Sequence, residues 1–169
     1  MPLPEKRQKE IMRLVHEGGD ELTQAIDLGE KEAEKHLEKI GREIADFLKT
    51  CTIKEELDLF AENWTRDGRE KPIHQLIENP HVDAGTLLRV FWLSDPEYFY
   101  ISTRSASEID VEYERDIFTT LETIERRITQ SEYKTASIPF DPTNWITMWD
   151  RRAEFARPIP EVMYQPITG

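Results

Sequence analysis

The stretch NWTRDGREKPIHQLIENPHVDAGTLLRVFWLSDPEYF, residues 63–99, carries the strongest structural signals in this chain. It combines large apolar side chains with Gly, Pro, Asn and Asp, the residues that form turns and helix ends. It contains no motif of a known catalytic site. The stretch is therefore either an unfamiliar site or a packed core with its turns, and the spacing of its residues favours the core.

Two short helices are predicted inside this stretch. The first begins at Pro72 and ends before Pro80, because proline suits the first turn of a helix and interrupts its interior. The second follows Asp83 as its N-cap and is stopped by Asp95-Pro96. The apolar side chains that these two helices are expected to bury are Ile73, Leu76, Ile77, Leu87, Leu88, Phe91 and Trp92.

A further helix is predicted to lead into the stretch. Thr52 is placed to cap it, and Glu55 stands at the reciprocal position of a capping box. The chain then turns at Asp67-Gly68, where the residue pair favours positive φ. The apolar face of this helix comprises Leu57, Phe60, Ala61 and Trp64.

The first fifty residues predict a helical hairpin. Ile11, Leu14 and Val15 recur at helical spacing, the segment EGGD then breaks the pattern, and Asp20 is placed to cap the next helix. From there one apolar stripe continues, with charged residues on the other faces, as on a helix that packs along one side. The stripe comprises Leu22, Ile26, Ala33, Leu37, Ile40, Ile44 and Phe47.

The C-terminal part of the chain predicts one long helix and an irregular tail. Residues 111–129 keep helical spacing, and their acidic start complements the helix dipole. The tail is rich in proline and carries Trp145 and Trp149, which we expect on one short helix. Because two tryptophans are not expected to be left in water, the tail should lie across the body as a strap.

These elements define the expected fold class, which is mostly α. Residues 1–169 should form a single compact multi-helix domain. Within it we expect an N-terminal helical hairpin over residues 1–50, a helical core over residues 52–132, and a Pro/Trp-rich C-terminal strap over residues 133–169.

The composition restricts the partners and the compartment. The chain has 34 acidic and 22 basic side chains, a net charge of −12. Such a surface repels nucleic acid and anionic lipid and attracts basic proteins. No apolar run approaches a membrane span, and the start MPLPEKRQKE lacks the apolar stretch of a signal peptide. We therefore expect a cytoplasmic protein that binds neither nucleic acid nor membrane, with its one cysteine, Cys51, as a buried structural thiol.

The motifs of common enzymes are missing from the sequence. It contains no G-x-S-x-G nucleophile motif and no phosphate-binding glycine loop. His74, His81 and Asp83 could meet across a turn, but a zinc site usually needs three or four ligands at tight spacing, and no H-E-x-x-H motif is present. We expect a protein that is not an enzyme, with no catalytic residue, metal or cofactor. An enzyme with a pocket near His74 and His81 is left as an alternative.

The best candidate for a binding site is a run of acidic residues, which we call the acidic surface. In such a site charge sets the rate of encounter with a basic protein, and a few buried anchors set the affinity. A surface that only keeps the protein in solution explains the same run equally well. The acidic surface comprises Glu108, Asp110, Glu112, Glu114 and Asp116.

Residues 63–99 resemble a small bacterial family that is catalogued as domain of unknown function four-two-seven-four. The shared pattern is a helix ending in NW, then DG, a helix led by Pro, NP, a D-x-G-T cap and an apolar helix ending in FWL. In this chain these elements are Asn63-Trp64, Asp67-Gly68, Pro72, Asn79-Pro80, Asp83 to Thr86, and Phe91-Trp92-Leu93. This chain has His81 where the family commonly has Cys, which argues against a shared thiol chemistry.

The resemblance implies a small cytoplasmic bacterial protein, and some members look like immunity proteins encoded beside secreted toxins. No catalytic residues follow from it. The leading hypothesis is an immunity protein whose acidic surface binds the basic surface of a cognate, nuclease-type toxin domain. A helical scaffold or adaptor without a toxin is the alternative among binding proteins.

Overall fold

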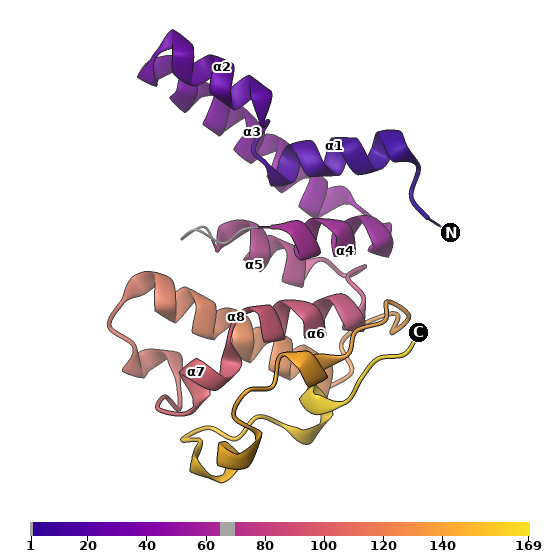
Figure 1. Ribbon diagram of the computed structural model, residues 1–169, viewed down its shortest axis with the longest axis vertical. Helices are drawn as coiled ribbons and strands as arrows, with labels where there is room; N and C mark the ends of the chain where they lie inside the picture. The colour runs from indigo at the N-terminus through magenta and orange to yellow at the C-terminus, as the bar shows by residue number, and fades with distance from the viewer. Residues whose placement is uncertain (1, 65–69) are drawn as a thin grey trace.

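Helices are stacked in layers along the long axis of the molecule (Figure 1). The computed structural model describes residues 2–64 and 70–169, and these residues form eight α-helices, four short 3-10 helices and no β-strand. The α-helices are α1 (Glu5–Val15), α2 (Asp20–Leu28), α3 (Glu30–Thr50), α4 (Lys54–Asn63), α5 (Lys71–Glu78), α6 (Ala84–Leu93), α7 (Pro96–Tyr100) and α8 (Glu112–Thr129). The 3-10 helices are η1 (Ala106–Glu108), η2 (Pro142–Asn144), η3 (Trp149–Glu154) and η4 (Glu161–Tyr164).

The layers share one core, so the fold is a mostly α, single compact domain. α1 and α3 pack on α4 and α5, which pack in turn on α6 and α8. Residues 133–169 then cover α6 and α8 (Figure 1). Leu57, Leu76, Leu87 and Leu121, one from each of four helices, are completely buried. None of the helices in the described ranges carries an apolar stretch long enough to cross a bilayer.

The described residues of the stretch 63–99 contribute much of this core, as predicted. α5 has Pro72 in its first turn and ends before Asn79. Asp83 caps α6 by accepting a hydrogen bond of 2.9 Å from the backbone N–H of Gly85. Phe91 and Trp92 are buried, as is Trp64 at the end of α4. The predicted turn at Asp67-Gly68 lies outside the described residues.

The pair Asp95-Pro96 ends one helix and begins another. α6 stops at Leu93, and Asp95 takes a left-handed conformation with φ of 53°. Pro96 then starts the short helix α7, which was not predicted. The first N–H groups of a helix have no partner within the helix, so the missing N–H of proline costs nothing there. Pro96, which was expected only to stop α6, therefore also starts α7.

The N-terminal hairpin differs from the prediction. The predicted continuous stripe is interrupted at Gly29, whose φ of 117° is a conformation that glycine adopts readily. The chain reverses there, so the hairpin is formed by α2 and the first half of α3 (Figure 1). α1 lies outside this hairpin and packs mainly on α4. Ile26 and Leu37 of the stripe are 59% and 41% exposed. The buried members in the second half of α3 are Ile40, Ile44 and Phe47.

Two predicted N-caps are wrong. The N-cap of α2 is Gly19 and not Asp20, and that of α4 is Ile53 and not Thr52. Neither residue caps its helix through a side chain. Because α4 begins later than predicted, Glu55 is not at the position that a capping box requires. Acidic residues in the first turns of α2 and α4 stabilise these helices instead, because negative charge interacts favourably with the positive end of the helix dipole.

Residues 133–169 are fastened to the body by buried groups of α6 and α7. The indole N–H of Trp92 donates a hydrogen bond of 2.8 Å to the carbonyl of Met163. The buried carboxylate of Glu97 accepts from the backbone N–H groups of Thr147 and Met148, at 2.8 Å and 3.0 Å. One isolated β-bridge joins Phe140 to Ile167 near the C-terminus.

The prediction for the two tryptophans of the tail is wrong. Trp145 is 44% exposed and Trp149 is 52% exposed. They do not share a helix, since η2 ends at Asn144 and η3 begins at Trp149. Phe140, Phe155, Ile159, Met163 and Tyr164 provide the buried contacts of the tail instead.

Candidate functional site

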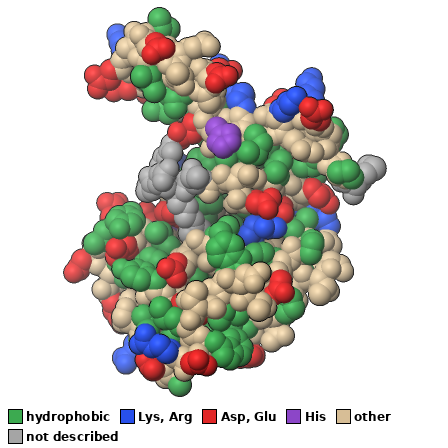
Figure 2. All heavy atoms as spheres, viewed as in Figure 1, with side chains coloured by type: hydrophobic (Ala, Val, Ile, Leu, Met, Phe, Trp, Pro, Cys, Tyr) green, Lys and Arg blue, Asp and Glu red, His purple; other side chains and the backbone are tan. Residues whose placement is uncertain are grey.

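The acidic surface lies where the chain enters α8. Glu108 ends η1, and Glu112 and Glu114 lie in the first turn of α8, which begins within one residue of its predicted start. Four of the five carboxylates are exposed, and Glu114 is half-buried. Figure 2 shows acidic and hydrophobic side chains together at the left edge of the molecule, where α7 and the start of α8 lie in Figure 1.

The carboxylates of the acidic surface form no ion pair with any residue of the described chain. The nearest base in sequence, Arg115, is occupied elsewhere, because its guanidinium donates to the carbonyls of Ile109, at 2.7 Å, and Asp110, at 3.2 Å. Glu108 accepts a hydrogen bond of 2.9 Å from the backbone N–H of Arg104. The surface therefore keeps its negative charge available to a partner.

Exposed apolar side chains accompany these acids, and no pattern in the sequence marks them as part of the site. Tyr98 is 57% exposed, Val111 45% and Tyr113 52%. The Tyr113 hydroxyl donates to Glu114 at 3.2 Å, and this hydrogen bond raises the pKa of Tyr113 above its usual range. Tyr113 stands at helical spacing with the buried Leu121 and Ile124 of α8, so spacing alone does not distinguish it from a core residue.

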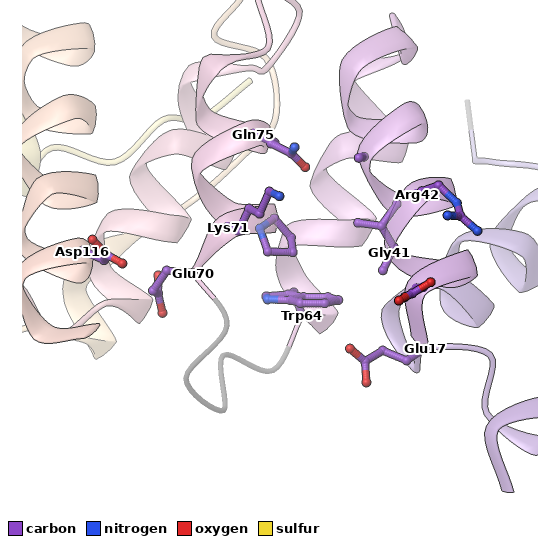
Figure 3. Close-up of a pocket in the computed structure, with 12 residues that line it drawn as sticks. Glu17, Gly41, Arg42, Trp64, Glu70, Lys71, Gln75 and Asp116 are labelled. Atoms are coloured by element: carbon purple, nitrogen blue, oxygen red, sulfur yellow. The ribbon is translucent and has the colours of Figure 1, made fainter. Parts of the chain in front are cut away.

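A pocket of about 640 Å³ adjoins one end of the acidic surface (Figure 3). It lies between α3 and the start of α5, and Asp116 of α8 stands at its edge. The imidazole Nε2 of His74 lies 3.1 Å from the Asp116 carbonyl oxygen, so α5 and α8 are held together there. The ionisable side chains that line the pocket are Glu17, Glu38, Glu70, Asp116, Arg42 and Lys71, and the apolar ones include Trp64 and Pro72.

The structure does not assemble the alternative site at His74, His81 and Asp83. The His74 ring contacts α8, and the backbone N–H of His81 donates to the side chain of Asn79 at 2.7 Å. Asp83 is fully buried, and its carboxylate accepts backbone hydrogen bonds on both sides. Across residues 2–64 and 70–169, no three His, Cys, Asp or Glu side chains lie together in a way that could hold a metal ion.

Cys51 is a buried thiol, as predicted. Burial raises its pKa to about 11, and a hydrogen bond of 3.4 Å to the carboxylate of Glu56 adds to this effect. The reactive form of cysteine is the thiolate. The environment of Cys51 therefore favours a structural role in the contact between α3 and α4.

The fold and this surface describe an all-helical domain with an acidic, aromatic-bearing face. In a comparison with known protein families, residues 53–129 match the family described as domain of unknown function, DUF4274. The chain carries this domain as a segment that runs from α4 to the end of α8, which is longer than the resemblance over residues 63–99. No curated protein and no solved structure matches the chain.

Proposed function

We propose that this protein is an immunity protein, which binds a cognate nuclease-type toxin domain through the acidic surface and neutralises it. The observation that carries the proposal is the set of carboxylates without ion pairs beside two exposed tyrosines, Tyr98 of α7 and Tyr113 at the start of α8. The resemblance of residues 63–99 to a family with immunity-like members supports the same role.

The chemistry of the surface suits such a partner. A nuclease binds phosphate with basic side chains, and a row of exposed carboxylates can occupy the same positions. Complementary charge speeds the encounter of two proteins and excludes wrong partners, while aromatic anchors such as Tyr98 and Tyr113 slow dissociation. Charge and apolar area are both present at the start of α8.

A helical adaptor without a toxin is the second candidate, and one observation favours it. The hairpin of α2 and α3 exposes Ile26, Leu28 and Leu37, the second of them 78% exposed. Apolar side chains on a projecting hairpin can contact another helical protein.

Co-expression tests the immunity role. The genes on either side should be searched for a large secreted protein, and the chain should be produced together with the C-terminal domain of that protein, with both pull-down and rescue of growth measured. The lack of such a neighbour counts against the proposal. We expect a stable complex and restored growth. Failure to bind or to rescue growth contradicts the proposal.

Charge reversal then tests the acidic surface. Changing Glu108, Asp110, Glu112 and Glu114 to Lys should slow association about tenfold or more at low salt, because electrostatic steering is lost, and the difference should shrink at high salt. The matched control changes four other exposed acids to Lys, namely Asp20, Asp27, Glu30 and Glu34. Like the acidic surface, this set includes residues in the first turn of a helix, Asp20 in α2 and Glu30 in α3. An unchanged association rate, or equal slowing in the control, removes the acidic surface from the proposal.

A further inference from the structure

The two exposed tryptophans of the C-terminal strap have no role in the core or at the acidic surface. A half-exposed tryptophan leaves a large apolar area in water, and such residues are concentrated where proteins bind their partners. In the shared view of Figures 1 and 2, hydrophobic, basic and acidic side chains lie together at the lower end of the molecule, where the strap lies. This region is separate from the acidic surface.

Trp149 stands between two cavities. The larger, of about 420 Å³, is lined by Trp149, Tyr164 and Arg152 together with Asp150, Pro158 and Ile159. The smaller, of about 350 Å³, is lined by Thr143, Ile146, Trp149 and Tyr164. The rings of Trp149 and Tyr164 meet edge to face, with their centroids 5.4 Å apart. Two neighbouring cavities thus share one aromatic wall.

The aromatic wall is held in place before any ligand binds. Tyr164 is buried and packs on Trp92 of α6, with the ring centroids 5.4 Å apart. The Arg152 guanidinium lies 4.3 Å from the Trp149 ring centroid and 4.1 Å from that of Tyr164, and it pairs with Glu161 at 2.5 Å. A preorganised wall lowers the entropy that binding must overcome.

The aromatic lining of this site suits an extended proline-rich segment. A polyproline II helix repeats every three residues and leaves its backbone carbonyls without internal hydrogen bonds, and it binds in grooves lined by aromatic rings. The indole N–H of Trp149 has no hydrogen-bond partner in the described chain, so it is available to such a carbonyl. A β-strand would need a sheet edge, and the described residues offer only one isolated bridge.

The charge at the site indicates what should flank the prolines. Arg151 pairs with Glu154 at 2.8 Å, and Arg152 pairs with Glu161. Asp150, at the larger cavity, is exposed and has no ion pair with a described residue. We propose that the paired cavities beside Trp149 bind a proline-rich segment of a partner protein in the polyproline II conformation, with a basic residue of that segment against Asp150.

Peptide titration of the full chain tests this site. The probes are an acetylated ten-proline peptide, the same peptide with a Lys-Lys end, and a glycine–serine peptide of equal length. Nitrogen-15 NMR follows the indole signals of the four tryptophans. We expect a saturable shift of the Trp149 signal with both proline peptides, tighter binding of the Lys-Lys form, and no shift with the glycine–serine peptide.

Variants locate the binding. Trp149→Ala should weaken binding about tenfold or more, as expected for an aromatic anchor, whereas the matched control Trp145→Ala should change it less than about twofold. Asp150→Lys should abolish the advantage of the Lys-Lys end without affecting the plain peptide. Equal melting temperatures will show that the variants are folded.

The proposal is overturned by the absence of a shift at millimolar peptide, by unchanged binding to Trp149→Ala, or by equal binding of the glycine–serine peptide. Self-association of the wild-type chain that Trp149→Ala abolishes would assign the cavities to a second copy of the chain and overturn it as well.

Discussion

Two glycines within helices show how the surroundings of a residue determine whether a larger side chain can replace it. Gly85 lies in the first turn of α6, and a Cβ atom added there would be 1.8 Å from the carbonyl oxygen of Ile138 in the strap. Gly41 lies in α3, and an added Cβ atom would meet nothing within 4 Å. The close approach of the strap makes Gly85 necessary, whereas helix geometry alone would favour alanine at both positions.

Alanine substitutions at these two glycines should therefore have opposite effects. Gly85→Ala should destabilise the fold by about 1–3 kcal/mol, because the strap backbone must move away from α6. Gly41→Ala should stabilise it by about 0.5–1 kcal/mol, because alanine loses less conformational entropy on folding. Urea unfolding measures both. A neutral Gly85→Ala would show that the strap does not pass over α6 at this point.

At the scale of the element, the sequence identifies helices well and their long-range contacts poorly. α5, α6 and α8 could be predicted because caps, prolines and apolar spacing all act within one helix. Asp83 could be predicted as a cap of α6. Its bonds to the strap, 54 residues further along the chain, have no local signal. The chain reversal at Gly29 was missed because the apolar spacing continues through it.

The strap should be released by loss of the Asp83 charge. Burial opposes the ionisation of Asp83, but hydrogen bonds from Thr135 and from the backbone N–H groups of Ser137, Gly85 and Ile138 outweigh it, so the pKa of Asp83 is lowered. A lowered pKa means that the stabilisation is complete above the unfolded pKa, about 4, and is lost as the pH falls through the folded pKa.

Asp83→Asn should therefore lower the free energy of unfolding at pH 7 by about 2–4 kcal/mol, because an amide nitrogen cannot accept these hydrogen bonds. The difference from wild type should shrink as the pH approaches 3, as measured by urea unfolding at both pH values. Asp141→Asn is the control, since asparagine caps as well as aspartate and the change should be close to neutral. A difference that stays constant between the two pH values contradicts the role of the charge.

At the scale of the whole molecule, the candidate site was predictable in its charge and not in its shape. Charged side chains are almost always on the surface, so the acidic surface could be predicted from its residues. The exposure of Tyr98 and Tyr113 could not, because helical spacing does not show where the body of the protein ends. The pocket beside Asp116 is lined by segments that are distant in sequence, including α3, α5 and α8. No local sequence pattern predicts it.

The domain match over residues 53–129 divides this core, because it leaves out α1, α3 and the strap. Within the matched segment, Leu57 and Phe60 of α4 and Trp92 of α6 are buried. Ile11 of α1, Leu48 of α3 and Met163 of the strap, all completely buried, are among the core residues that the segment lacks. The matched segment alone is close to the size limit below which, at about 70–80 residues, a single core rarely supplies more than about 3–5 kcal/mol. It therefore has little buried area to lose.

A fragment of residues 53–129 should therefore not fold cooperatively, although it contains the whole matched domain. Near-ultraviolet circular dichroism and thermal unfolding should show no fixed aromatic environment and no sharp transition for the fragment. The full chain should unfold in one cooperative step, since its layers share one core. A fragment with a dispersed NMR spectrum and a single sharp transition would show that the matched domain is independent, with the hairpin and the strap as additions to it.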